Sequence, residues 1–201
     1  WLMHEYFEEC IRLRFHLRFI GSAVKKIVYS FTLKRPVSEF IPIDKFYGSY
    51  YATDLRNADI YTQVIYRSPV DIQKDINAGV YQDVDLPTPS QSGITSFAEK
   101  IDTILGFNPD YDNDPQYVLL EQHCFLDIED EGEALPYIVT VEQDSRQVLS
   151  IRRNYEQNDP NRQKRSHFVH YRFVPGFGFY GLGLIHFLGN LTMSATAAMR
   201  S

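Results

Sequence analysis

A glycine-rich segment near the carboxyl end has residue types and a spacing that suit nucleotide binding. Gly176, Gly178 and Gly181 match the G-x-G-x-x-G fingerprint, whose glycines let the backbone approach a pyrophosphate where a helix begins. The fingerprint also needs an acidic residue about 20 positions further on to hold the ribose, but no Asp or Glu follows Asp159. Aromatic residues between the glycines also crowd the pyrophosphate space. We interpret the segment as a structural turn, with nucleotide binding as the alternative.

An acidic segment resembles the start and end of a calcium-binding loop. Asp110, Asp112, Asp114 and Glu121 stand at positions that supply oxygen ligands in an EF-hand. The sixth position, where a sharp turn requires glycine, is Pro115, and the residues that follow favour a strand over a second helix. We interpret this segment as a solvated acidic loop, and an enzyme with a metal site there stays the alternative.

The histidines and cysteines form no pair that suits catalysis or metal binding. His167 and His170 lie three residues apart on a predicted strand, so their side chains point to opposite faces. The same holds for the adjacent residues His123 and Cys124. No G-x-S-x-G, Walker-A or H-E-x-x-H motif is present. The sequence therefore predicts no catalytic residue, no metal ligand and no cofactor, and we expect a protein that is not an enzyme.

A basic cluster in the last third of the chain has two interpretations. Its members are Arg152, Arg153, Arg162, Lys164, Arg165 and Arg172. Basic side chains contact phosphates by charge, without reading base sequence. They also pair with carboxylates, and the acidic segment 101–145 of the same or a neighbouring copy offers these, which favours the second interpretation. Arg162, Lys164 and Arg165 are the candidates for facing DNA.

Charge is distributed unevenly along the chain. The net charge of the 201 residues is −6, which argues against a protein that binds nucleic acid over its whole surface. Residues 101–145 contain 12 acidic and no basic side chains, whereas residues 146–201 contain 8 basic and 2 acidic ones. Segregated charge is typical of a protein whose faces meet different partners or neighbouring copies of itself.

Composition indicates a folded globular protein. Hydrophobic residues make up 44% of the chain, which is ordinary for a folded domain. Cys10 and Cys124 belong to no C-x-x-C pair, so we expect no disulfide or zinc site and a reduced, intracellular setting. The uncharged run 173–199 includes Pro175 and several glycine and hydroxyl residues, so it is too polar and too broken for a membrane helix. We expect no membrane partner.

Hydrophobic periodicity predicts a mixture of helices and strands, and therefore the α+β class. The predicted helices are 1–20 (one or two), 69–77, 94–105 and 184–200. Ser68 followed by Pro69 indicates the start of the helix 69–77. A loop is expected at 44–49 and a linker at 85–93. The predicted strands are 23–32 and 37–41 as a hairpin, 60–66, 117–128, two strands within 137–154 that form a second hairpin with its turn at 143–146, and 167–174.

The last predicted helix is amphipathic. Its apolar side chains recur at helical spacing: Leu184, Phe187, Leu188, Leu191, Ala195, Ala198 and Met199. The opposite face contains His186, Asn190 and Ala197, and is therefore small and nearly uncharged.

Several segments resemble one protein family in the same order. They are GSAVKK (21–26), RPVSEFIP (35–42), ATDL (52–55), YQDVDLP (81–87), LPYIVTVEQDSRQVLSIRRN (135–154) and HFVHYRFVPGFGFYGLGLIHFLGNLTMSATAAMR (167–200). These segments resemble the portal proteins of short-tailed, double-stranded DNA bacteriophages, which form the head-to-tail connector at one capsid vertex through which DNA is packed and ejected.

The resemblance implies a self-associating ring of twelve copies around a DNA channel. Its partners would be terminase, scaffold and capsid proteins, tail and head-completion proteins, and the passing double-stranded DNA. The location would be the portal vertex of the virion, and the host cytoplasm during assembly. The chain would be part of a longer protein, with a wing-like α+β region at 1–135, a β-hairpin and clip-like region at 136–180, and the start of a stem-type helix at 181–201.

The resemblance also suggests site residues. Phe177, Phe179 and Tyr180 on the glycine turn are predicted to contact a neighbouring subunit, because exposed aromatic rings are enriched at interfaces. The small face with His186, Asn190 and Ala197 is predicted to border the channel, because a channel for moving DNA must not bind it tightly.

Overall fold

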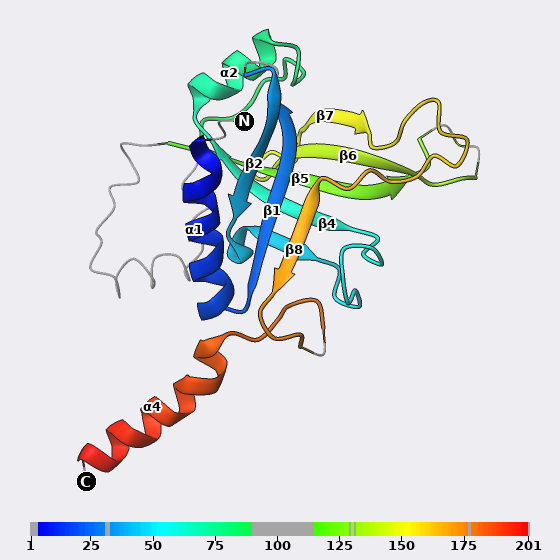
Figure 1. The fold of residues 1–201 in the computed structure, drawn as a ribbon. Coiled ribbons are helices and arrows are strands. Elements are labelled where there is room, and N and C mark those ends of the chain that lie inside the picture. The colour runs from blue at the N-terminus through cyan, green and yellow to red at the C-terminus, as the bar shows by residue number, and fades with distance from the viewer. Residues whose placement is uncertain are drawn as a thin grey trace. The chain divides into compact units, whose positions relative to one another are not determined.

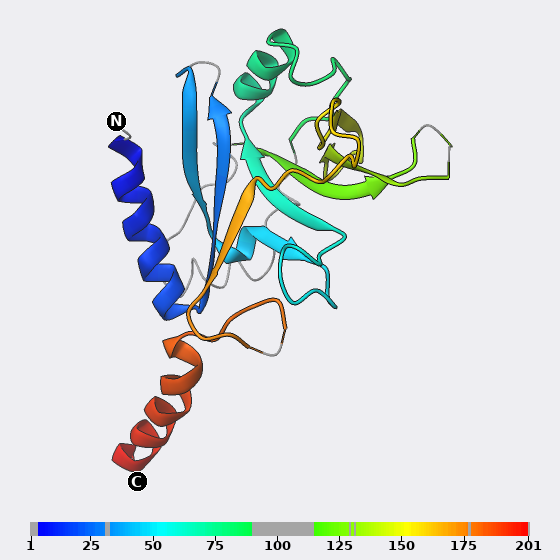
Figure 2. The same ribbon diagram turned by 45° about the vertical axis from the view of Figure 1, so that its right-hand side comes forward.

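The computed structural model describes residues 4–30, 33–89, 115–128, 130, 132–176 and 178–200. Helices are mixed with antiparallel strands, which confirms the predicted α+β class (Figure 1; Figure 2). The chain divides into two compact units: unit 1 comprises Trp1–Tyr61 and Arg165–Ser201, and unit 2 comprises Thr62–Lys164. Unit 1 is therefore assembled from two stretches that are distant in sequence.

Unit 1 is built on a three-stranded antiparallel sheet with the order β2-β1-β8. Its strands are β1 (Ser22–Ser30), β2 (Arg35–Ile41) and β8 (Phe168–Arg172). In the central strand β1, Val24 pairs with Ile41 of β2 on one side and with His170 of β8 on the other. The predicted hairpin 23–41 and the predicted strand 167–174 are both confirmed.

Two helices and two short elements complete unit 1. They are α1 (His4–Phe19), the 3-10 helix η1 (Ile43–Lys45), β3 (Phe46–Gly48) and α4 (Leu184–Arg200). Polar contacts attach α1 to β2: Arg35 Nη2 donates to Glu5 Oε2 at 2.9 Å, and the backbone N of Phe40 donates to Glu9 Oε2. The helix α1 accordingly lies alongside the β1–β2 hairpin (Figure 2).

Aromatic rings form the core of unit 1. Phe46 is fully buried, and its ring centroid lies 5.1 Å from that of Phe168 and 5.9 Å from that of Tyr61. Val24 and Ile41 of the sheet are buried in the same cluster. Residues 44–49 were predicted as a loop, but they contain part of η1 and the strand β3, because Phe46 turns inward to fill this core.

Unit 2 contains neighbouring strands in the order β4-β5-β6-β7. They are β4 (Tyr61–Arg67), β5 (Tyr117–Leu126), β6 (Leu135–Glu142) and β7 (Val148–Arg153). β6 pairs antiparallel with both β5 and β7, with a register shift between Thr140 and Val141. The predicted strands and the predicted β6–β7 hairpin are confirmed. Ile72, Leu119 and Leu149 form the apolar core.

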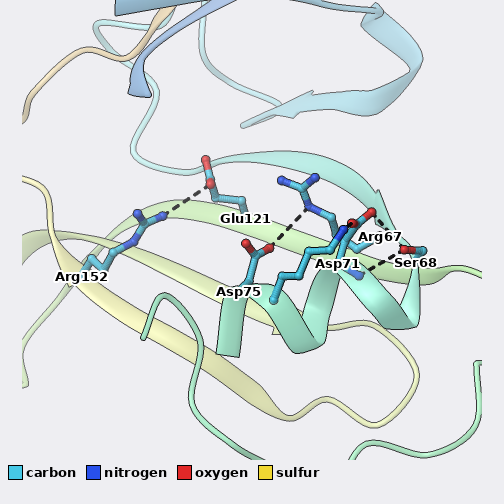
Figure 3. Close-up of polar contacts among 7 residues, drawn as sticks. Arg67, Ser68, Asp71, Asp75, Glu121 and Arg152 are labelled. Carbon is cyan, nitrogen blue, oxygen red and sulfur yellow. Dashed lines mark hydrogen bonds and ion pairs between the residues drawn. The ribbon is translucent and has the colours of Figure 1, made fainter. Parts of the chain in front are cut away.

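The helix α2 (Pro69–Asn77) shows why the sequence around it was informative. Ser68 caps the helix: its Oγ accepts from the backbone N of Asp71 at 3.2 Å and donates to Asp71 Oδ2 at 2.9 Å. Pro69 occupies the first turn, where its missing N–H costs nothing. Lys74 Nζ pairs with Asp71 Oδ1 at 3.1 Å. Arg67 Nε lies 3.9 Å from Asp75 Oδ2 (Figure 3).

Some predictions fall outside the described residues or follow other boundaries. The predicted helix 94–105, residues 90–93 of the predicted linker and the acidic positions Asp110, Asp112 and Asp114 lie outside the described residues. The regional boundaries at 135 and 180 came from the family resemblance and do not coincide with the limits of the two units. They stay a prediction.

Candidate functional site

The glycine segment connects β8 to α4 as a closed loop. Val174 and Leu182 form an antiparallel bridge, with backbone N–O distances of 3.2 Å and 2.8 Å in the two directions. The strand β8 is hydrogen-bonded antiparallel to β1, whereas the dinucleotide fingerprint belongs to a parallel βαβ unit. The local topology therefore favours the structural interpretation of this loop.

The glycines allow two backbone segments of unit 1 to touch. A Cβ on Gly183 would lie 2.4 Å from the backbone N of Gly21, and a Cβ on Gly181 would lie 2.5 Å from the Gly21 carbonyl oxygen. Gly21 itself has a φ of +102°, which only glycine adopts readily. The backbone N of Gly181 also donates to Ser22 Oγ at 2.7 Å. These glycines are used for close packing at the start of β1.

The aromatic residues of the loop lie in different environments. Phe179 is only 4% exposed, and its ring stacks on His170 at a centroid distance of 4.6 Å. Tyr180 is 44% exposed, and its hydroxyl donates to the backbone oxygen of Phe46 at 3.2 Å. Burial raises the pKa of the Tyr180 phenol. The three aromatic residues were predicted to contact a neighbouring subunit, which requires exposed rings. Tyr180 has such an exposed ring and Phe179 does not. Phe177 lies outside the described residues.

The helix α4 presents an apolar surface that nothing in the described chain covers. None of its residues is buried against the described residues, and its apolar side chains include Phe187, which is 49% exposed, and Leu191, which is 66% exposed. Its hydroxyl groups bond to the helix backbone: Thr192 Oγ1 donates to the Leu188 oxygen at 2.9 Å. Ser194 and Thr196 do the same. These hydroxyls therefore add little polarity to the surface.

The predicted small face of α4 is exposed as well. His186 lies in the first turn of the helix, and its Nδ1 accepts from the backbone N of Gly183 at 3.0 Å. Asn190 and Ala197 lie on the exposed surface further along. His186 therefore makes a hydrogen bond that stabilises the start of the helix, independently of its predicted position beside the channel.

A second exposed apolar surface lies on α1. Its large apolar side chains that are about half exposed or more are Tyr6, Phe7, Ile11, Phe15 and Phe19. The last turn of α1 lies near the first turn of α4. The rest of α4 extends away from the sheet of unit 1 (Figure 1; Figure 2). Singly scattered apolar side chains are normal on a soluble monomer, whereas these are grouped on two helices.

The basic cluster contacts acidic residues of its own chain. Arg152 Nη2 lies 3.6 Å from Glu121 Oε2 (Figure 3). Arg162 Nη1 lies 4.0 Å from Glu133 Oε2, and Lys164 Nζ lies over the ring of Phe125 at 5.6 Å. Both carboxylates belong to the acidic segment 101–145. These contacts therefore agree with the second interpretation of the basic cluster, in which it pairs with carboxylates.

Sequence reasoning missed a buried polar group on the sheet of unit 2. Glu121 was considered only as the end of a calcium loop, but it lies in β5 and its Oε1 is 3.2 Å from Nε2 of the buried His123. Asn154 Nδ2 lies 3.4 Å from the other ring nitrogen of His123. The available signal was the two-residue spacing of Glu121 and His123, which places both on one face of a strand.

The remaining candidates for chemistry are structural in this arrangement. Burial raises the pKa of the Cys124 thiol, which disfavours the nucleophilic thiolate. Neither Cys10 nor Cys124 forms a disulfide with any described residue. Among the described residues, no group of three or more His, Cys, Asp or Glu side chains is placed to hold a metal ion.

Within the described part of the chain, no helix has the length and apolarity needed to span a membrane. The chain matches no protein-family model and no curated protein.

Proposed function

We propose that this chain is a subunit of a phage portal, a ring-shaped homo-oligomer through which DNA enters and leaves the capsid. The uncovered apolar surface of α4 is the observation on which the proposal depends. A helix with apolar side chains and internally bonded hydroxyls is normally buried, and α4 is not buried against the described part of its own chain. Neighbouring copies are the partners that a ring supplies.

Two further observations support a ring of identical subunits. A closed ring needs two different patches that meet head to tail, and the apolar surfaces on α1 and α4 are separate elements of one unit. Charge is also segregated, with a strongly acidic segment 101–145 and a basic segment 146–201. Part of that charge is paired within the chain, as Arg152 and Glu121 show, and complementary charge on neighbouring copies would favour the same kind of pairing between subunits.

The chemistry of α4 suits a channel wall. Apart from His186, the only ionisable side chain of the helix is Arg200. Such a surface attracts DNA phosphates weakly, and weak attraction permits movement. We propose that the face with His186, Asn190 and Ala197 borders the channel. Arg162, Lys164 and Arg165 are proposed to approach DNA elsewhere, and Tyr180 is proposed to contact a neighbouring subunit.

The same proposal includes the partners and the location that a portal requires. Terminase would dock during packaging, scaffold and capsid proteins during assembly, and tail and head-completion proteins afterwards. The protein would then be a component of the virion at one capsid vertex. It would have no enzymatic activity of its own.

Negative-stain microscopy of the full-length gene product tests this proposal. Closed rings with a central hole are the expected result. The double variant Leu188→Gln and Leu191→Gln keeps helix propensity but removes apolar surface, so we expect an intact fold and loss of rings. The control is Val70→Gln, because Val70 is a comparably exposed apolar residue on α2 of unit 2.

Two results would contradict the proposal. The first is a discrete monomer or dimer of the full-length protein at high concentration. The second is ring formation that the α4 double variant leaves unchanged. Equilibrium dialysis with labelled nucleotide or calcium then tests the alternative, an enzyme that uses the Gly176–Gly181 loop or the Asp110–Glu121 segment. Stoichiometric binding would favour that alternative.

A further inference from the structure

Unit 1 contains a cavity of about 470 Å³ between the loop that precedes β4 and the strand β8. Its polar lining includes Asp54, Arg56, Ser166, His170 and Arg172, and Leu55 contributes an apolar wall. The volume falls in the range of small-molecule sites, about 300–1,000 Å³. Because the polar groups come from both parts of unit 1, the cavity exists only in the folded unit.

The loop side of the cavity is held rigidly by its own hydrogen bonds. Asp54 Oδ1 accepts from the backbone N of Arg56 at 2.7 Å and from that of Asn57 at 3.1 Å. Asn57 Oδ1 accepts in return from the backbone N of Thr53 and of Asp54. The backbone bonds from Asn57 and Arg56 lower the pKa of Asp54. The Asp54 carboxylate therefore acts mainly within its loop and fixes the position of Arg56.

Two arginines give the cavity a positive charge. Arg172 Nη1 donates to the backbone oxygen of Thr53 at 2.9 Å, which joins β8 to the loop. Within the described residues, no carboxylate lies within ion-pair distance of Arg56 or Arg172. Two guanidinium groups and one carboxylate leave a net charge of +1. The unused guanidinium donors suit a ligand with several acceptor oxygens.

His170 is a third polar residue in the cavity lining. Its Nε2 is buried and has no hydrogen-bond partner among the described residues. The ring stacks on Phe179, which holds its orientation. Burial and the charge of Arg172 lower the His170 pKa to about 4, against the opposing effect of Asp54. The imidazole is therefore neutral at pH 7, and a buried polar nitrogen of this kind normally has a partner.

We propose that this cavity binds a phosphate group, with the guanidinium groups of Arg56 and Arg172 as donors and the His170 ring in the wall beside them. Planar guanidinium groups match the geometry of phosphate oxygens, and the cavity leaves room beside Leu55 for the organic part of a phosphate ester. The phosphate can come from a small phosphate ester or from a nucleic-acid backbone. The proposal is independent of ring formation.

The test is a titration of the full chain with inorganic phosphate, followed by NMR of the His170 ring. We expect saturable changes in the His170 signal and a rise of its pKa above 4, because a bound anion stabilises the imidazolium. Arg56→Gln should weaken binding about tenfold or more, since a charge-assisted hydrogen bond is lost. The matched control is Arg12→Gln, an exposed arginine of α1 in the same unit, which should bind normally.

Arg56→Gln is the preferred variant because the Arg56 side chain makes no hydrogen bond or ion pair with the described residues, so its loss should leave the fold intact. Arg172→Gln, which also loses the bond to Thr53, is the second variant. Absence of a saturable change would overturn the proposal, and so would equal effects of Arg56→Gln and Arg12→Gln. A parallel titration with a short DNA duplex identifies the source of the phosphate: binding that depends on Arg56 supports the nucleic-acid backbone, and binding of free phosphate alone supports a small ester.

Discussion

The two units of this protein differ in which side chains they bury and which they leave exposed. Unit 1 has a core of stacked aromatic rings, yet leaves large apolar side chains of α1 and α4 exposed. Unit 2 buries polar residues on its sheet, where Glu121, Thr140 and Ser150 follow one another across three strands. Unit 1 therefore has apolar surface left for association. In unit 2 the buried Glu121 contacts His123, whereas the buried hydroxyls of Thr140 and Ser150 have no hydrogen-bond partner among the described residues.

The difference indicates which changes affect folding and which affect assembly. In unit 1, the sheet core and the glycine contacts determine stability, while the exposed helix faces are available for other chains. In unit 2, helix capping and buried hydrogen bonds contribute to stability, and exposed apolar side chains on α2 such as Val70 are isolated. Pairs of variants, one at a contact and one at a comparable position without that contact, can separate effects on folding stability from effects on association.

The largest expected effect is at the glycine contact of unit 1. Gly183→Ala places a Cβ 2.4 Å from backbone atoms of Phe19, Ile20 and Gly21. Backbone atoms cannot move aside as a flexible side chain does, so we expect a loss of more than about 4 kcal/mol and failure of unit 1 to fold. The measurement is chemical denaturation followed by circular dichroism.

The control for this variant is Gly189→Ala. A Cβ on Gly189 meets no atom within 4 Å, and Gly189 lies inside α4. Replacing a helical glycine with alanine should leave the fold unchanged and favour the helix by about 1 kcal/mol. Equal stability of the two variants would show that the close approach at Gly183 is not required.

The next effect concerns the aromatic core. Phe179→Ala removes a buried ring that stacks on His170, and we expect a loss of about 3–5 kcal/mol in the free energy of unfolding. Tyr180→Phe removes only the hydroxyl bond to Phe46 and should cost about 1 kcal/mol. Urea unfolding of both variants measures the loss in the free energy of unfolding. If Phe179→Ala destabilised the fold no more than Tyr180→Phe, its placement in the core would be wrong.

The helix cap of unit 2 should have a smaller effect. Ser68→Ala removes the acceptor for the Asp71 backbone N and should cost about 1 kcal/mol. The control is Ser68→Asp, which restores a cap and should retain most of the stability. The thermal unfolding midpoint of each variant distinguishes them. Identical midpoints for Ser68→Ala and the unaltered protein would argue against the cap.

The last prediction concerns the pH dependence of stability. The pKa of His170 is about 4 in the folded chain, below its ordinary value of 6.5, so the unfolded chain binds the proton more readily. Stability of unit 1 should therefore fall as pH decreases from about 6.5 towards 4. His170→Gln should reduce that slope in urea unfolding.

Asp54→Asn provides the comparison for that experiment. The pKa of Asp54 is lowered below 3.8, so its contribution to stability is lost only at more acidic pH than that of His170. An unchanged slope between pH 6.5 and 4 in the His170→Gln variant would show that the imidazole is not buried as the structure describes.

The sequence alone determined the local elements of both units. Ser68 followed by Pro69 predicted the start of α2, since both signals act within one helical turn. Alternating apolar residues predicted the strands, and the turn at 143–146 predicted the second hairpin. These features depend on neighbours in sequence, and the α+β class followed from their order.

Only the tertiary structure decided which side chains are covered and which residues meet. Phe179 and Tyr180 are adjacent aromatic residues, but one enters the core and the other stays half exposed, because the loop is held against the distant Gly21. Arg56 and Arg172 line one cavity although more than a hundred residues separate them in sequence. Such contacts depend on how distant segments pack, which local patterns of charge and hydrophobicity do not specify.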